Sequence, residues 1–234
     1  FSRVSQLNLR NSIFIDITAN QNISEMYEAY LRQNIAVVTC NKIACASSSE
    51  NYNTLKKVSR KSNVSFLYET NVGAGLPIID TLKNLIASGD RVHKIQAVLS
   101  GSLNFVFNKY DASSTFSAVV KQAAIEGYTE PDPKIDLSGI DVARKILILA
   151  RESGFDLELE DIENNSFLSK ESLDTNNNAD FYLSLDKHES QFQQLFLESK
   201  VNNCRLKYVA EFKDGKAKVG LQQINPSHSF YNLE

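Results

Sequence analysis

The chain has 234 residues, of which 42% are hydrophobic and 23% are charged, a composition typical of a folded globular protein. This length is enough to bury a sizeable core in one domain or in two. The net charge is −3 and no block of basic residues is present, so we expect no binding to nucleic acid. No apolar run approaches the ~20 residues of a membrane helix and no signal-peptide pattern opens the chain, so we expect no membrane partner either.

The cysteines and histidines carry no recognisable chemistry. The three cysteines, Cys40, Cys45 and Cys204, are odd in number and form no Cys-x-x-Cys pair. This pattern favours neither a disulfide framework nor a zinc site, and it fits the reducing cytoplasm. The three histidines are scattered without the spacing of metal ligands, so we assign them no role.

The first third of the chain alternates between short apolar runs and helical segments. Residues 12–18, 34–40 and 64–68 are short apolar runs, the first of them rich in β-branched residues, and predict buried strands. The intervening segments 23–33 and 49–62 predict helices, the first through an apolar stripe of 3.6-residue period. This order indicates the parallel sheet of an α/β nucleotide-binding fold.

The pyrophosphate loop of such a fold is missing from this segment. The nine glycines form no G-x-G-x-x-G motif. Either the protein binds no dinucleotide, or the first strand and its glycine loop lie upstream of Phe1. We expect the second, because the chain begins with Phe rather than Met and enters the sheet as though midway through it.

The rest of the chain mixes helices with an antiparallel pair of strands. Residues 205–212 and 216–224 alternate about Lys213-Asp214-Gly215, which is a strong hairpin signal. The other expected elements are helices over 78–87, 115–126 and 181–200, a strand over 93–99, an acidic connector over 151–167 and a polar loop over 169–178.

The segment 127–145, GYTEPDPKIDLSGIDVARK, has the strongest chemical signal. Pro131 and Pro133 fix φ and favour extended conformations before them, so Glu130 and Asp132 are expected on a stiff, non-helical segment. We expect a helix from near Gly139, capped by Ser138 or Asp136.

The beginning of that helix brings a carboxylate and an ammonium group together. Asp141 is expected in the first turn, where a carboxylate suits the positive end of the helix dipole. Lys145 follows four residues later on the same face. A lysine beside carboxylates suits an amino-acid substrate, whose ammonium the carboxylates hold while the lysine gives or takes a proton. An acidic surface loop with an ordinary ion pair is the alternative interpretation.

The run GYTEPDP followed by DLSGIDVARK resembles the signature of homoserine dehydrogenases, NAD(P)-dependent enzymes that interconvert aspartate semialdehyde and homoserine. The likeness is strongest to the dehydrogenase part of bifunctional aspartokinase/homoserine dehydrogenases. The family usually has Arg-Asp-Asp after the second proline, where this chain has Lys134-Ile135-Asp136. The departure affects only auxiliary charges of the loop, because Asp136 keeps the last of the three positions.

Four other segments resemble motifs of the same family. The resemblance implies a segment that closes over the cofactor, a V-T-x-N-K motif with an active-site lysine, a cation-binding turn and a substrate-binding turn. These segments are Asp16-Ile17-Thr18-Ala19-Asn20, Val38-Thr39-Cys40-Asn41-Lys42, Asn71-Val72-Gly73-Ala74-Gly75-Leu76-Pro77 and Ser100-Gly101-Ser102-Leu103.

The resemblance implies a role for each candidate site residue. Lys145 is the first candidate for the acid that protonates the carbonyl oxygen, with Lys42 as the alternative, and Asp141 orients Lys145. The remaining roles divide by ligand. The substrate is expected at Glu130, Asp136, Gly101 and Ser102, NADP or NAD at Thr18, Ala19, Thr39 and Lys42, and a sodium ion at the main-chain carbonyls of Glu69, Val72, Ala74 and Leu76.

The implied architecture is α/β, with a partial Rossmann-type sheet over residues 1–70. An α+β substrate and dimerisation domain with a mixed sheet follows over 71–234, in a homodimer or higher homo-oligomer. Relatives continue into a glycine-rich segment and a helix, so the chain resembles the middle of such an enzyme. Two other functions stay open: a non-catalytic assembly fragment of a larger protein, and a reductase of another amino-acid semialdehyde.

Overall fold

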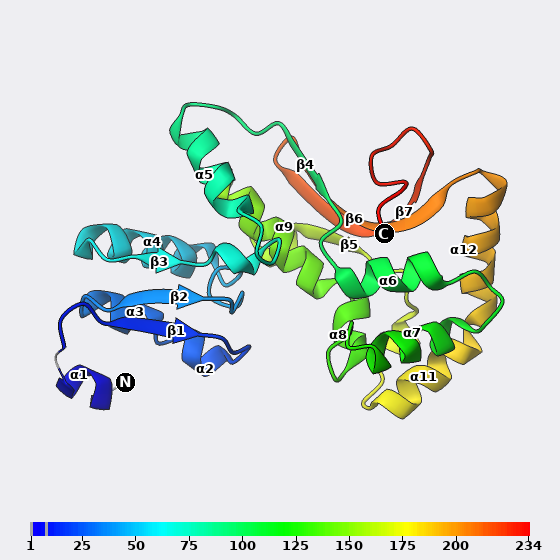
Figure 1. The fold of residues 1–234 in the computed structure, drawn as a ribbon, viewed down its shortest axis with the longest axis horizontal. Helices are drawn as coiled ribbons and strands as arrows, with labels where there is room; N and C mark the ends of the chain where they lie inside the picture. Colours follow the sequence, from blue (N-terminus) through cyan, green and yellow to red (C-terminus); the bar gives the residue numbers. More distant parts are fainter. Residues whose placement is uncertain (1, 8) are drawn as a thin grey trace. The chain divides into compact units, whose positions relative to one another are not determined.

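The computed structural model describes residues 2–7 and 9–234 and divides into two compact units (Figure 1). The first unit comprises Phe1–His93 and Arg144–Ile162, and the second comprises Lys94–Ala143 and Glu163–Glu234. Across the described ranges, no helix combines the length and the apolar character that a membrane span requires.

The first unit contains the parallel sheet that the sequence predicts. Strands β1 (Ile13–Asp16), β2 (Ala36–Thr39) and β3 (Phe66–Leu67) follow one another in the order β1-β2-β3, and both pairs are parallel. Each strand is shorter than the apolar run that predicts it. The carboxyl ends of β1 and β2 are in register, since Asp16 pairs with Thr39.

Helices precede, connect and follow these strands. They are α1 (Ser2–Leu7), α2 (Gln21–Ser24), α3 (Tyr27–Arg32), α4 (Ser49–Ser62), the 3-10 helix η1 (Glu69–Asn71) and α5 (Ile78–Ala87). Phe14 of β1 stacks on Tyr30 of α3 with 4.3 Å between ring centroids. Tyr27, Leu31 and Val37 are completely buried, so the core lies where α3 meets the sheet.

The prediction of one helix over 23–33 is wrong in detail. The Asn20 side chain accepts a hydrogen bond from the Ile23 amide and starts α2 earlier than expected. The Met26 amide then bonds the Ile23 carbonyl at 3.1 Å, three residues back, rather than four. This tighter turn separates α2 from α3.

The second unit is built on a four-stranded mixed sheet, as the fold prediction requires. The sheet consists of β4 (Lys94–Ala97), β6 (Arg205–Lys213), β7 (Lys216–Ile224) and β5 (Ile162–Asn165), in the order β4-β6-β7-β5. The predicted hairpin is confirmed, because β6 and β7 pair antiparallel up to Lys213 opposite Lys216. β4 joins the other side of β6, also antiparallel.

Seven α-helices and one 3-10 helix lie in the chain after β4. They are α6 (Gly101–Lys109), α7 (Phe116–Ile125), α8 (Pro133–Leu137), α9 (Ile140–Glu152), η2 (Leu159–Asp161), α10 (Lys170–Leu173), α11 (Asn178–Lys187) and α12 (Glu189–Val201). An aromatic cluster fills the core of the second unit, where Phe116 of α7 stacks on Phe192 of α12 at 4.0 Å and Phe167 meets both rings edge-on.

Three local predictions differ from the structure in this half of the chain. The helix expected over 181–200 is two helices, because His188 leaves the helical torsions at φ −98° and ψ 14°. The expected connector over 151–167 begins inside α9 and contains β5. The expected polar loop over 169–178 contains α10, which the Ser169 side chain caps. Short polar elements of this kind carry too little apolar periodicity to be recognised in a sequence.

The helix expected to begin near Gly139 is confirmed as α9. Its first residue is Ile140, and the Ile140 amide donates to the Ser138 hydroxyl at 3.3 Å. Asp141 lies in the first turn, as expected. Gly139 has φ +76°, and a Cβ there would overlap the Tyr208 hydroxyl and come within 3.0 Å of Asn164 Oδ1.

We therefore expect Gly139→Ala to destabilise the protein. Left-handed backbone costs a non-glycine residue about 1–2 kcal/mol, and overpacking adds about 1–3 kcal/mol, so a total loss of roughly 2–5 kcal/mol is expected. Chemical denaturation measures this loss. Gly127→Ala is the matched control, because Gly127 has φ +79° with nothing within 4 Å of an added Cβ. Equal losses in the two variants would show that the Tyr208 contact does not matter.

Candidate active site

The ends of β1 and β2 are joined by a buried hydrogen-bond network in the first unit. The Asn41 side-chain amide donates to Asp16 Oδ2 at 3.1 Å and to the Asn20 carbonyl at 3.0 Å. The Tyr27 hydroxyl donates to Asp16 and lies 2.7 Å from the Thr39 hydroxyl. Since these contacts link segments that follow two neighbouring strands, they hold both loops at the carboxyl edge of the sheet, where ligands of parallel sheets bind.

Asp16 acts as the ionised centre of this network. Burial by itself raises the pKa of the Asp16 carboxyl, but hydrogen bonds from Tyr27, Thr18 and Asn41 outweigh burial and lower it. The pKa of the Tyr27 hydroxyl is raised by burial and by its hydrogen bond to Asp16. Tyr27 therefore remains a proton donor to a carboxylate, which makes the hydrogen bond strong.

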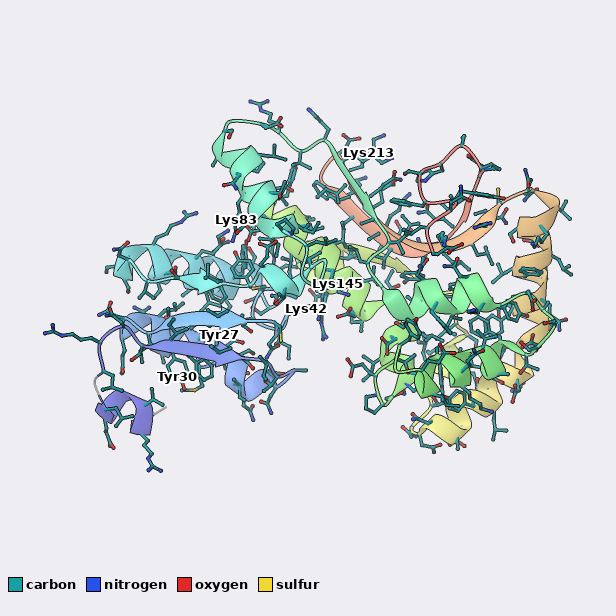
Figure 2. The ribbon with its side chains drawn as sticks, viewed as in Figure 1. Tyr27, Tyr30, Lys42, Lys83, Lys145 and Lys213 are labelled. Carbon is teal, nitrogen blue, oxygen red and sulfur yellow. The ribbon has the colours of Figure 1, made fainter. Side chains whose placement is uncertain are left out.

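The four candidate cofactor residues all follow the ends of β1 and β2 or close β2. Thr18 and Ala19 are exposed, whereas Thr39 is buried and its hydroxyl already accepts from the Asn41 amide at 2.9 Å. Lys42 is half-buried, three residues past the end of β2 (Figure 2). Thr18 and Ala19 thus offer exposed groups to a ligand, while the Thr39 side chain serves the network.

Lys145 lies on α9, in the part of this helix that belongs to the first unit, and it is half-buried (Figure 2). The last turn of α9 is anchored by buried charge. Lys56 of α4 donates to Glu152 Oε2 at 3.0 Å, and the Tyr68 hydroxyl donates to Glu152 Oε1 at 2.5 Å. The Tyr52 hydroxyl makes a further short hydrogen bond to the same oxygen.

The partners of Glu152 keep it ionised. Burial raises the pKa of the Glu152 carboxyl, but the ammonium of Lys56 and the hydroxyls of Tyr52 and Tyr68 outweigh burial, so that the pKa lies below its ordinary value of 4.5. The Glu152 side chain is 1% exposed and that of Lys56 is 25% exposed. A buried charge with this many partners holds the end of α9 against α4 and the segment after β3.

The candidate substrate residues meet in the second unit, at the beginning of α6. The Ser100 hydroxyl caps α6 by accepting from the Leu103 amide at 3.1 Å and lies 2.9 Å from the Ser102 hydroxyl. Ser102 in turn donates to Asp136 Oδ1 at 2.9 Å. The Glu130 amide donates to the other carboxylate oxygen, Asp136 Oδ2, at 2.8 Å.

Asp136 is therefore fixed through both oxygens, although the sequence predicts it in a loop and the structure places it in α8. Burial raises the pKa of the Asp136 carboxyl, and the neighbouring carboxylates of Glu130 and Asp141 raise it further, against the two hydrogen bonds. A cation placed beside this carboxylate would stabilise its ionised form. Such a site suits a ligand that carries an ammonium group.

The carbonyl-rich turn after β3 has a defined backbone. Gly73 has φ +83° and Ala74 has φ +52°, so the chain reverses direction between η1 and α5. The Glu69 carboxylate accepts from the amides of Ile79 and Asp80, at 2.8 Å each, and so caps α5. Among the candidate cation ligands, the carbonyls of Glu69 and Leu76 accept from the amides of Val72 and Ile78 at 3.4 and 2.9 Å. Each keeps a second lone pair for a cation.

Several supporting residues escape sequence reasoning. Asn71 is fully buried and, with its amide turned to donate, bonds the carbonyls of Cys40 and Thr39 at 3.1 and 3.2 Å. Arg151 and Glu152 are 6% exposed, although both types are usually at the surface. Their position directly after a fully apolar run, residues 146–150, is the one sequence signal that points to burial. Within the described ranges, no group of three His, Cys, Asp or Glu side chains could hold a metal ion.

The parallel three-stranded sheet of the first unit and the mixed four-stranded sheet of the second define an α/β protein with two units. Comparison with family models agrees: residues 2–69 match the NAD-binding domain of homoserine dehydrogenase, and residues 77–234 match the homoserine dehydrogenase domain. The chain belongs to the homoserine dehydrogenase family. The resemblance inferred from the GYTEPDP and DLSGIDVARK segments is confirmed.

Individual relatives agree with this assignment. The bifunctional aspartokinase/homoserine dehydrogenase of Haemophilus influenzae is 39% identical over 224 residues, which cover 96% of this chain and 28% of the relative. The homoserine dehydrogenase of Schizosaccharomyces pombe is 37% identical over 231 residues, which cover 95% of this chain and 61% of the relative. The chain thus spans less than two thirds of both proteins.

Solved structures support the fold. A Candida auris protein of unknown function superimposes with a TM-score of 0.91 at 33% identity, over 100% of this chain and 68% of that chain. A putative homoserine dehydrogenase from Archaeoglobus fulgidus superimposes with a TM-score of 0.74 at 20% identity, over 93% of this chain and 61% of that chain. The predicted α/β architecture is confirmed.

The charge of Glu152 should stabilise the protein only while the carboxyl is ionised. Because folding lowers its pKa, the stabilisation is present above the ordinary pKa of 4.5 and is lost as the pH falls through the folded value. We expect Glu152→Gln to reduce the free energy of unfolding by about 2 kcal/mol near pH 7, and the difference from wild type to shrink below about pH 4.5.

Urea denaturation between pH 3.5 and 8 measures this dependence. Glu28→Gln is the control, because Glu28 pairs with Arg32 at the surface, with 37% and 59% of the side chains exposed. We expect Glu28→Gln to reduce the free energy of unfolding by about 0–1 kcal/mol. If the loss of unfolding free energy in Glu152→Gln does not change with pH, the ionic role of Glu152 is contradicted.

Proposed function

We propose that the protein interconverts L-homoserine and L-aspartate 4-semialdehyde by hydride transfer with NADP or NAD. The observation that carries this proposal is the placement of two lysines in the unit that holds the NAD-binding domain. Lys42 follows β2, and Lys145 lies on α9 in a chain that belongs to the homoserine dehydrogenase family. A lysine at the ligand edge of a nucleotide-binding sheet, as Lys42 is, suits proton transfer to a carbonyl oxygen.

The residues present at the sheet edge fit a dinucleotide. Thr18 and Ala19 present exposed groups, and the segment after β2 is held by the Asp16 network. When bound, the nicotinamide supplies or accepts the hydride. This chain would hold it along the ends of β1 and β2 through Thr18, Ala19, Thr39 and Lys42.

Lys145 is the proposed acid and base. During reduction the aldehyde oxygen gains negative charge, and the Lys145 ammonium stabilises it and gives a proton, whereas during oxidation the neutral amine takes the proton of the hydroxyl. Such a transfer contributes typically about 10²–10⁴-fold. Asp141, one helical turn before Lys145, orients the ammonium, and Lys42 is the alternative acid.

The substrate ammonium is assigned to Glu130 and Asp136. Asp136 is held through both oxygens, by Ser102 and by the Glu130 amide, so its carboxylate is in place before a ligand arrives. Gly101 exposes its backbone at the beginning of α6, beside Ser102. A small amino acid that approaches this turn meets negative charge and little steric bulk.

The remaining assignments extend the same proposal. Residues 1–70 would serve the cofactor, and residues 71–234 the substrate and assembly. The mixed sheet would form the interface of a homodimer or higher homo-oligomer in the cytoplasm. The reaction would supply the biosynthesis of threonine and methionine. A sodium ion would be coordinated by four main-chain carbonyls, those of Glu69, Val72, Ala74 and Leu76. All four belong to the turn that contains the positive φ angles of Gly73 and Ala74.

Replacing Lys145 tests the proposed acid. We expect Lys145→Ala to lower kcat for homoserine oxidation by about 10²–10⁴-fold, with a smaller change in KM, because the proton transfer occurs in the transition state. The assay follows NAD(P)H formation at 340 nm with the full-length protein, its folding checked by circular dichroism. Lys57→Ala is the control, because Lys57 is an exposed lysine of the same unit.

A Lys145→Ala enzyme with near-normal kcat would remove the assignment. If the folded wild type oxidises no homoserine, substrate profiling with other amino-acid semialdehydes distinguishes a related reductase from a non-catalytic assembly fragment.

Replacing Asp136 tests the ammonium site. We expect Asp136→Asn to raise KM for homoserine by roughly 10- to 100-fold, because a charge-assisted hydrogen bond is worth about 1.5–3 kcal/mol, while KM for the dinucleotide changes little. Asp132→Asn is the matched control, because the Asp132 side chain caps α8 at the Lys134 amide at 3.0 Å. Equal changes in both KM values would indicate a general loss of structure instead.

A further inference from the structure

Arg151 lies six residues after Lys145, in the last turn of α9, and its side chain is 1% exposed. All five N–H donors of its guanidinium are engaged. Nη1 donates to the Cys45 carbonyl at 3.0 Å and to the Ser47 carbonyl at 2.7 Å. Nε and Nη2 donate to the Leu157 carbonyl at 3.0 and 2.8 Å, and Nη2 also donates to Glu158 Oε2 at 3.0 Å.

Two of these acceptors belong to the segment that carries Lys42. We call residues 40–48, between β2 and α4, the Lys42 loop. Inside this loop the Ala46 amide donates to the Lys42 carbonyl at 2.9 Å, directly beside the Cys45 carbonyl that Arg151 binds. The guanidinium therefore connects the helix of Lys145 to the backbone turn of Lys42 through one rigid group.

The far side of the guanidinium is fixed as well. Glu158 accepts from Arg151 and also from the amide of Ser49, the first residue of α4. The Ser49 amide lies 2.9 Å and 3.0 Å from the two carboxylate oxygens of Glu158. The loop is consequently held at its middle by Arg151 and at its end by Glu158. Only a planar donor group with several N–H vectors can bind three backbone carbonyls and a carboxylate at once.

From this geometry we infer that Arg151 is a positioning residue, which sets the Lys42 ammonium relative to the helix of Lys145. The inference rests on the proposed function, because it gives Lys42 a part in the reaction. Arg151 touches neither substrate nor cofactor in this assignment and acts through the loop. A displacement of about 1 Å in a catalytic group is enough to cost about 10²-fold in rate, so a loop tether of this kind has catalytic consequences.

The variant Arg151→Lys tests the tether, because lysine keeps the positive charge but cannot bind the Cys45, Ser47 and Leu157 carbonyls together. We expect a fall in kcat for homoserine oxidation of about 10- to 100-fold in the full-length enzyme. Arg32→Lys is the matched control, because Arg32 is an exposed arginine of the same unit, paired with Glu28. It should leave kcat within about twofold of wild type.

A double-mutant cycle with Lys42→Gln separates positioning from a general structural role. If Arg151 acts through Lys42, Arg151→Lys should cost little further activity once Lys42 is absent. Loss of a group that assists proton transfer leaves activity about 10²–10⁴-fold lower, which remains measurable at high enzyme concentration. The same fold-loss in both backgrounds would overturn the inference, as would an unchanged kcat in Arg151→Lys.

Amide hydrogen exchange supplies a measurement that does not depend on activity. We expect faster exchange over residues 42–48 in Arg151→Lys than in wild type, while peptides from β6 and β7 stay unchanged. Unchanged exchange in the loop would overturn the tether itself. A wild type that fails to oxidise homoserine while the variant shows faster loop exchange would overturn the proposed function and not the tether.

Discussion

The buried charges at the end of α9 are the constraint on which the first unit depends. Glu152 and Arg151 follow one another in the chain, and burial of either alone would be very unfavourable. Each is compensated differently: Glu152 by an ammonium group and two tyrosine hydroxyls, and Arg151 by three carbonyls and a carboxylate. Because these partners come from α4, the Lys42 loop, the segment after β3 and the segment after α9, they fix the last turn of the helix that bears Lys145 within the first unit.

The acidic segment of the second unit is organised by the same principle on a smaller scale. Partial burial disfavours the ionised form of Asp136, in agreement with its raised pKa. The Ser102 hydroxyl and the Glu130 amide stabilise it and at the same time connect α8 to the beginning of α6. The Asp136 carboxylate oxygens thus both hold these segments together and are candidates for binding the ligand. The Asp136 carboxylate, which both hydrogen bonds hold in place, also stands to gain from a substrate ammonium.

Much of the fold follows from local patterns in the sequence. The short apolar runs predict β1, β2 and β3, and the alternation about Asp214-Gly215 predicts the hairpin of β6 and β7 with its turn. Ser138 and Asp141 mark the beginning of α9. The failures have a common cause. The break at Met26, the break at His188 and strand β5 each depend on a few hydrogen bonds or on a distant partner, such as the Tyr208 hydroxyl that bonds Asn164.

The sequence by itself determined the family, the α/β class and the chemical types in the candidate site, because motif spacing and apolar periodicity are local properties of the chain. It also indicated Lys42, Lys145 and Asp136 as residues of interest. Only the tertiary structure decided which groups support them. The Asp16–Tyr27–Asn41 network, the burial of Arg151 and the pairing of Glu152 with Lys56 join residues about 11 to 106 positions apart. Contacts over such separations leave no periodic signal, since their energy arises only when folding removes water from both partners.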